Sequence, residues 1–171
     1  MGIAAFATAS ESDHWIDIAR QSILSECGMR ASLSTDTSTP LPVFVTIEVG
    51  GVIRGCRGDL TVRTKNLGQE IELAARGAAK HDPRYRPLSE VELRTFLVTV
   101  TLVDRVEPIG SIATLSPADG LVLKSGNRAG VVLPWEGKDP ATRLKWAYIK
   151  AGVKEGSPVS LERLVARRYR G

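Results

Sequence analysis

The feature that most restricts the fold of this chain is a pair of glycine-punctuated hairpin signals. Residues 43–49 are rich in Val, Ile and Thr, and Gly50-Gly51 follows them directly. Two consecutive glycines supply the positive φ angles of a two-residue hairpin turn, so we expect the chain to reverse into a second strand there. A second turn sequence, Ser125-Gly126-Asn127, separates residues 121–124 from residues 129–133. The two hairpins together predict antiparallel β-structure.

Three segments beside these strands have the start signals of helices, in which a polar cap precedes apolar residues spaced three or four apart. The first covers about residues 12–27, with Ser12 or Asp13 as the cap; the others follow Asn66 and Asp139. A further capping-box pair at Ser89 and Glu92 predicts a short helix before a strand at residues 96–103. Because strands and helices do not alternate regularly, we expect an α+β fold with an antiparallel sheet and flanking helices.

The 171 residues, of which 43% are hydrophobic and 25% charged, are typical of one globular domain. We expect a single domain over residues 1–171. Its N-terminal helix is followed by a polar loop at 32–42, a motif-bearing core at 43–153 and a basic C-terminal segment at 160–171.

The number of cysteines and the composition of residues 1–10 indicate the cellular compartment and the cofactors to expect. Only Cys27 and Cys56 are present, so the chain has neither a disulfide framework nor a cysteine-rich zinc motif. Residues 1–10 carry no Lys or Arg and are too short and broken for a signal peptide or a membrane span. Phosphate-loop, dinucleotide and Gly-x-Ser-x-Gly motifs are also absent from the sequence. We expect a cytoplasmic protein without membrane association, metal or cofactor.

The net charge of +4 is unevenly distributed. Residues 1–42 hold two Arg and five acids, a balance of −3, whereas residues 43–171 hold 21 basic and 14 acidic residues, a balance of +7. The arginines of the C-terminal segment could contact nucleic acid, with three of them on one face if the segment is helical. The arginines of the segment are Arg163, Arg167, Arg168 and Arg170, and positions 163, 167 and 170 would share the helical face. Aromatic residues are sparse there, and a solvated basic surface explains the same pattern.

The main candidate functional motif is Arg54-Gly55-Cys56-Arg57-Gly58, which we expect to form a turn just after a strand. Its glycines permit a turn or a close approach, and its arginines could hold the Cys56 thiol as a thiolate. A nucleophile also needs a base, for which His81 and Asp82 are the candidates. Two other interpretations remain open: Cys56 is a small residue required for the shape of the turn, or the motif belongs to a non-catalytic binding surface.

Read in order, the motifs of residues 43–153 resemble the AMMECR1 family. They are Phe44-Val45-Thr46, Ile53-Arg54-Gly55-Cys56, Gly58, an Ala-Ala pair, Asp82-Pro83-Arg84-Tyr85 with Pro87-Leu88, Glu107-Pro108-Ile109, Asp119-Gly120-Leu121, Leu133-Pro134 and Lys150-Ala151-Gly152. The resemblance implies an α+β fold with a larger and a smaller lobe. It also implies a pathway or complex shared with a Memo-like protein and a radical SAM protein.

The resemblance carries the signature turn of the family onto Arg54, Gly55, Cys56 and Gly58. It carries a second polar motif onto Asp82, Pro83 and Arg84. The chain departs from the family pattern at Arg57, where an apolar residue is usual, and at Trp135, where Gln is frequent.

We therefore expect a non-catalytic binding or adaptor component. The expected binding residues are Arg54, Gly55, Cys56, Arg57, Gly58, Asp82 and Arg84. An enzyme that uses Cys56 with His81 or Asp82 is the alternative, and a nucleic-acid-binding protein is a further one.

Overall fold

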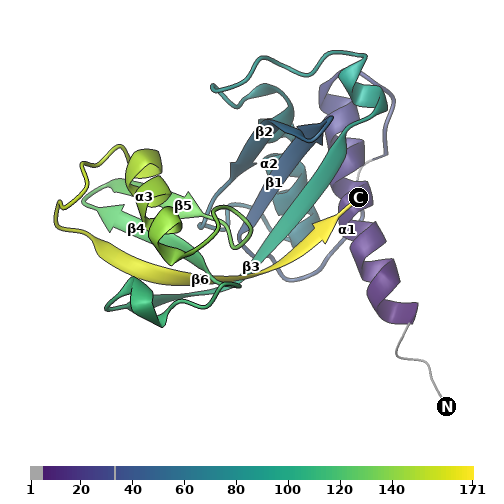
Figure 1. Cartoon of the computed structure of the whole chain (residues 1–171). Coiled ribbons are helices and arrows are strands. Elements are labelled where there is room, and N and C mark those ends of the chain that lie inside the picture. The colour runs from purple at the N-terminus through teal and green to yellow at the C-terminus, as the bar shows by residue number, and fades with distance from the viewer. Residues whose placement is uncertain (1–5, 33) are drawn as a thin grey trace. The chain divides into compact units, whose positions relative to one another are not determined.

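The computed structural model describes residues 6–32 and 34–171 (Figure 1). Three α-helices, two short 3₁₀ helices and six strands make up the described part of the chain. They are α1 (Phe6–Glu26), β1 (Val43–Val49), β2 (Val52–Gly58), α2 (Leu67–Lys80), η1 (Glu92–Arg94), β3 (Leu97–Ile109), η2 (Ile112–Thr114), β4 (Gly120–Ser125), β5 (Arg128–Val132), α3 (Pro140–Ala151) and β6 (Ser160–Arg170). The α+β class is confirmed.

The strands follow the order β2-β1-β3-β6-β4-β5 in one six-stranded sheet. Strand β1 pairs antiparallel with β2 and β3, and β4 pairs antiparallel with β5 and β6. Val98 and Gly171 exchange both backbone hydrogen bonds, at 2.8 and 3.0 Å, as antiparallel partners do. The expected antiparallel sheet is therefore present, with β2 and β5 as its edge strands.

The chain divides into two compact units, a larger one and a smaller one. Unit 1 comprises Met1–Leu102 and Arg168–Gly171, and unit 2 comprises Val103–Arg167. The first five residues, half of the N-terminal stretch that lacks Lys and Arg, lie outside the described part. No helix in the described ranges has the length and apolar character needed to cross a membrane.

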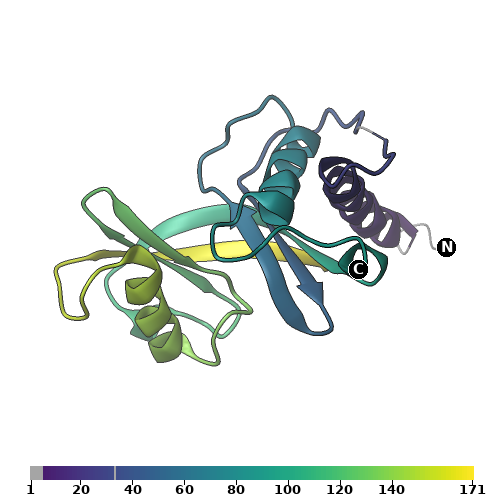
Figure 2. The same ribbon diagram turned by 90° about the horizontal axis from the view of Figure 1, so that it is seen from above.

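In unit 1, α1 and α2 pack against each other, and α2 also packs on both strands of the β1–β2 hairpin (Figure 2). The predicted apolar face of α1 is confirmed, because Trp15, Ile18, Ala19, Ser22 and Ile23 are all buried. Its predicted start is wrong. The helix begins at Phe6, and the proposed caps lie inside it, since the alanine-containing segment before them has sufficient helix propensity to extend the helix.

The β1–β2 hairpin has the predicted turn, with φ angles of 58° at Gly50 and 79° at Gly51. Strand β2 does not stop before the motif but continues to Gly58, so the predicted turn at Arg54–Gly58 is wrong. Cross-strand pairing with β1 extends this strand, and Cys56 lies opposite Thr46. The register shifts by one residue between Ile47 and Glu48, which leaves Arg54 as the extra residue of a β-bulge.

The glycines of β2 permit close packing instead of a turn. A Cβ atom placed on Gly55 would lie 2.0 Å from the carbonyl oxygen of Ala78 in α2, so no larger residue fits between strand and helix. Unit 2 has the same device, because a Cβ atom on Gly130 of β5 would lie 2.0 Å from the carbonyl oxygen of Ala147 in α3. In each unit, therefore, a glycine in the second strand of a hairpin allows a helix to pack closely on that strand.

Unit 2 contains the second predicted hairpin, β4–β5, and the predicted helix α3. Asp139 caps α3 by accepting the Thr142 N–H at 2.8 Å, and Gly152 ends it with a φ of 63°. Arg143 of this helix is buried, at 3% exposure, and donates to four backbone carbonyls. The acceptors are the carbonyls of Ser116, Pro117, Pro134 and Glu136.

The basic C-terminal segment forms strand β6, so the predicted helical face of arginines is wrong. In a strand, Arg163 and Arg167 share one face and Arg170 lies on the other. Each is paired with an acid within its own unit: Arg163 with Asp119 at 3.3 Å, Arg167 with Asp104 at 2.9 Å and Arg170 with Glu48 at 2.7 Å. These side chains hold the strand to its surroundings.

Candidate functional site

The side chains of Asp82 and Arg84 occupy the outer edge of β2 at Cys56. The Cys56 N–H donates to Oδ2 of Asp82 at 2.9 Å, and its carbonyl oxygen accepts from Nη2 of Arg84 at 3.0 Å. Both backbone groups of Cys56 point away from β1, and an edge strand would otherwise leave them unpaired. Asp82 and Arg84 therefore take the place of a missing neighbouring strand.

Asp82 and Arg84 form a strong ion pair beneath this edge. Arg84 donates from Nε to Oδ1 at 2.9 Å and from Nη2 to Oδ2 at 2.7 Å, while Asp82 is only 4% exposed. Burial by itself would raise the pKa of Asp82, but hydrogen bonds from Arg84 and Cys56 outweigh it and hold that pKa below its usual value. The same pairing raises the pKa of Arg84.

A second ion pair anchors the same strand one residue before Gly55. Nε of Arg54 donates to Oε1 of Glu92 at 2.6 Å. Oε2 of Glu92 accepts the N–H and the hydroxyl of Ser89, both at 2.8 Å, and the Glu92 N–H donates to Ser89 Oγ at 3.4 Å, so the predicted Ser89–Glu92 pair forms although the short helix begins after Val91. The Arg54 and Ser89 hydrogen bonds lower the pKa of Glu92 to about 2. We call the set Arg54, Cys56, Asp82, Arg84 and Glu92 the β2-edge cluster.

The two central residues of the motif lie on opposite faces of β2. Arg57 lies on the α2 face, where its Cβ would be 3.2 Å from a Cβ on Gly77. The Cys56 side chain lies on the other face, where its partly buried sulfur accepts the Thr46 hydroxyl at 3.2 Å. Thr46 also lies opposite Thr99 of β3, so Cys56 ends a row of three small polar side chains.

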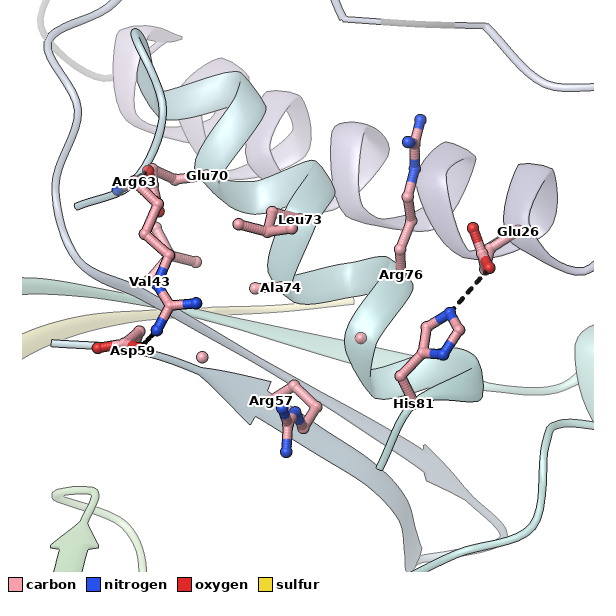
Figure 3. Close-up of a pocket in the computed structure, with 12 residues that line it drawn as sticks. Glu26, Val43, Arg57, Asp59, Arg63, Glu70, Leu73, Ala74, Arg76 and His81 are labelled. Atoms are coloured by element: carbon pink, nitrogen blue, oxygen red, sulfur yellow. Dashed lines mark hydrogen bonds and ion pairs between the residues drawn. The ribbon is translucent and has the colours of Figure 1, made fainter. Parts of the chain in front are cut away.

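The structure brings Asp82 and Arg84 to Cys56 and gives His81 a different partner. Nε2 of His81 lies 3.1 Å from Oε1 of Glu26, the last residue of α1 (Figure 3). The His81 backbone N–H donates to the Gly77 carbonyl at 2.9 Å and ends α2. The carboxylate of Asp82 meets Cys56 at the backbone N–H.

Sequence reasoning missed Thr46 as a partner of Cys56 and Glu26 as the partner of His81, and it assigned Glu92 only to a helix cap. Thr46 could have been found from the hairpin register, since a two-residue turn at 50–51 places it near Cys56. Nothing in the sequence signals that Glu26 meets His81. Within residues 6–32 and 34–171, no three His, Cys, Asp or Glu side chains are grouped so that they could hold a metal ion.

Comparison with known proteins gives a consistent relationship over most of the chain. A sequence model of the AMMECR1 family matches residues 16–171. A protein of Thermotoga maritima is 36% identical over 132 residues, which cover 74% of this chain and 76% of that protein. A protein of Aeropyrum pernix is 38% identical over 129 residues, which cover 67% of this chain but 55% of that protein, so the chain spans about half of this longer relative.

The fold is also found in a solved structure. The crystal structure of an uncharacterized protein from Pyrococcus horikoshii superimposes with a TM-score of 0.78 at 23% sequence identity, covering 91% of this chain and 89% of that chain. At this identity the similarity shows a shared fold.

Proposed function

The chain belongs to the AMMECR1 family, and on that premise we propose that it is a non-catalytic binding component whose partner contacts the surface around the β2-edge cluster. The resemblance of its motifs to the family suggests the partners, a Memo-like protein and a radical SAM protein. In this role the motif serves recognition of a partner and carries out no catalytic step.

One observation supports this proposal above the others: the ionisable groups around Cys56 are engaged in holding the chain together. Asp82 binds the Cys56 N–H and Arg84, and Glu92 binds Arg54. A catalytic base needs its lone pair directed at the proton it removes. These carboxylates instead direct their oxygens at guanidinium groups and at backbone N–H groups.

The same arrangement presents cations to a partner. The side chain of Arg84 is 54% exposed although it is anchored by Asp82, and that of Arg86 is 68% exposed beside Glu92. Arginine side chains that are held in place lose little freedom on binding, which favours their use in recognition. The proposed partner surface is therefore acidic where it meets Arg84 and Arg86.

The test is direct binding to a Memo-like protein and to a radical SAM protein, followed by charge reversal at Arg86. Arg86→Glu should weaken binding at least tenfold, because Arg86 is exposed and the substitution sets a carboxylate against the acidic surface of the partner. Arg105→Glu is the matched control, since Arg105 is also exposed and paired with a nearby acid, Glu107, but lies in unit 2. Equal binding of wild type and Arg86→Glu, or no binding of either protein, would contradict the proposal.

A further inference from the structure

A groove of about 400 Å³ runs along α2 on the face of β2 that carries Arg57 (Figure 3). Helix α2 contributes Leu73, Ala74 and Gly77 to it, and the chain at the end of β2 contributes Asp59. All of its lining residues belong to unit 1. Its volume lies in the range of small-molecule sites, and it combines an apolar wall with charged groups as such sites do.

The acids of the groove already have partners. Glu26 binds His81 at 3.1 Å, Asp59 is paired with Arg63, and Glu70 accepts the Arg63 backbone N–H at 2.6 Å. These interactions lie at the ends of the groove, as Figure 3 shows, with Arg57 between them. Each of these carboxylates is therefore engaged by a neighbouring group, and Arg63 offsets the charge of Asp59.

The side chain of Arg57 has no hydrogen bond or ion pair with any residue in the described ranges, although its backbone pairs with Val45 of β1. Its position is nonetheless defined, because its stem lies against Gly77, where an added Cβ would be only 3.2 Å from the Cβ of Arg57. A guanidinium presents a planar fork that pairs in two places with a carboxylate or phosphate. Arg57 thus offers an unused anion-binding group beside the apolar wall.

A second arginine of the groove, Arg76, is also without a partner in the described part of the chain, and its Nε is buried. Figure 3 shows its side chain directed toward α1 and away from Arg57, so the two guanidinium groups do not converge on one point. Arg76 adds positive charge on the α2 side of the groove. On the β2 side, Arg63 is paired with Asp59, whereas the guanidinium of Arg57 is left to hold an anion.

We propose that this groove binds a small organic anion whose carboxylate or phosphate pairs with Arg57 and whose apolar part lies on Leu73 and Ala74. Leu73 is 49% exposed on α2, so this part of the wall is available for contact. The inference is independent of the partner surface proposed above, because Arg57 and the Cys56 side chain lie on opposite faces of β2.

Amide chemical shifts of the full chain, titrated with benzoate, phenyl phosphate or inorganic phosphate, test the proposal. At least one aromatic probe should give saturable shifts at residues 57–59 and 73–77, and inorganic phosphate should bind at least fivefold more weakly than phenyl phosphate. The stronger aromatic probe identifies the anionic group that the site prefers. Leu73→Asn should remove the advantage of phenyl phosphate over inorganic phosphate.

Arg57→Gln should weaken the better probe at least tenfold, and Arg57→Lys should weaken it less, because the charge stays while the fork is lost. Arg94→Gln is the matched control and should change affinity less than twofold, since Arg94 is exposed outside the groove. Saturable binding that is unchanged in Arg57→Gln, or no saturable shift with any probe, would overturn the proposal. Arg86→Glu should leave probe binding unaltered, which separates this result from failure of the partner surface.

Discussion

Gly55 of β2 lies directly beneath Ala78 of α2, with room for a hydrogen atom but none for a methyl group. An added Cβ would lie 2.0 Å from the Ala78 carbonyl oxygen, a backbone atom that a rotamer change cannot move. The contact fixes how closely the helix approaches the edge strand. It makes Gly55 a packing residue of the motif.

Gly55→Ala should therefore lower the free energy of unfolding by more than about 2 kcal/mol, since overpacking a rigid contact forces the helix away from the strand. Chemical denaturation measures this loss. Gly110→Ala is the control: no atom lies within 4 Å of its added Cβ and its φ is not positive, so the change should stay within about 0.5 kcal/mol. Similar effects of the two substitutions would contradict the assignment.

The pKa of Glu92 predicts a pH dependence of stability. It is lowered to about 2 in the folded chain, against about 4.3 in an unfolded one, so its contribution is complete above about pH 4.3 and is lost as the pH falls toward 2. Glu92→Gln should destabilise the chain by about 1–2 kcal/mol at pH 6. The gap between variant and wild type should narrow steadily between pH 5 and pH 2.

Urea denaturation across that pH range checks the Glu92 prediction. Glu90→Gln, a change of an exposed neighbour, should leave the profile of the wild type unaltered. A gap for Glu92→Gln that stays constant from pH 6 to pH 2 would show that its carboxylate charge does not stabilise the fold.

Arg143→Lys should be strongly destabilising even though it conserves the charge. The guanidinium binds four backbone carbonyls from a buried position, and an ammonium group cannot reach all of them. Because buried acceptors left without a donor cost about 1–3 kcal/mol, we expect a loss of about 3 kcal/mol in thermal or chemical denaturation.

Arg128→Lys is the matched control for Arg143, since Arg128 also donates to a backbone carbonyl, that of Gly152, but from an exposed position. Its effect should be below about 1 kcal/mol. Amide hydrogen exchange should accelerate at Trp135 and Glu136 in Arg143→Lys alone. Equal losses of unfolding free energy in the two variants would show that the buried guanidinium of Arg143 has no special role in stability.

The proposal of a non-catalytic motif predicts ordinary thiol reactivity at Cys56. Arg54 and Arg84 are paired with acids, and Arg57 lies on the opposite face, so the thiol has little unneutralised positive charge beside it. Iodoacetamide should alkylate Cys56 at pH 7 no faster than in the urea-unfolded chain, as peptide mass spectrometry can measure.

Cys27 provides an internal reference for the alkylation experiment. Burial raises the pKa of the Cys27 thiol, opposed in part by Lys80, so this residue should react more slowly in the folded chain than in the unfolded one. Alkylation of Cys56 that is accelerated by folding, and that Asp82→Asn abolishes, would support the enzyme alternative.

Features encoded by neighbouring residues could be predicted from the sequence. The hairpin at Gly50-Gly51, the cap of α2 at Asn66 and the start of α3 at Asp139 all depend on contacts within a few positions, and the structure has each of them. The class of fold followed from these local signals together with the spacing of apolar residues.

Features that depend on distant partners were not predictable in the same way. The motif at Arg54–Gly58 contains turn-forming glycines, yet it is a strand because β1 extends its pairing to Gly58. The spacing of the C-terminal arginines suits one face of a helix, yet β4 pairs with this segment as a strand. In both segments, tertiary hydrogen bonding overrides the local pattern.

The candidate site shows the same limit. Sequence motifs marked Cys56, Asp82 and Arg84 as related, but only the structure shows that the carboxylate of Asp82 accepts the backbone N–H of Cys56. Cys56 and Arg57 are neighbours in sequence, and the alternation of a strand sends them to opposite faces.

The closure of β2 at Cys56 bears on how this protein can associate with others. An edge strand with free backbone groups can recruit a strand from a partner or from another copy, which leads to sheet extension or aggregation. At Cys56 such an addition would first have to displace the buried carboxylate of Asp82. A side chain also covers the other edge strand, β5. Lys150 donates to the Val131 carbonyl at 3.0 Å and is held in place by Glu136. Association at these two positions must therefore proceed through side chains, which discriminate between partners far better than a bare backbone does.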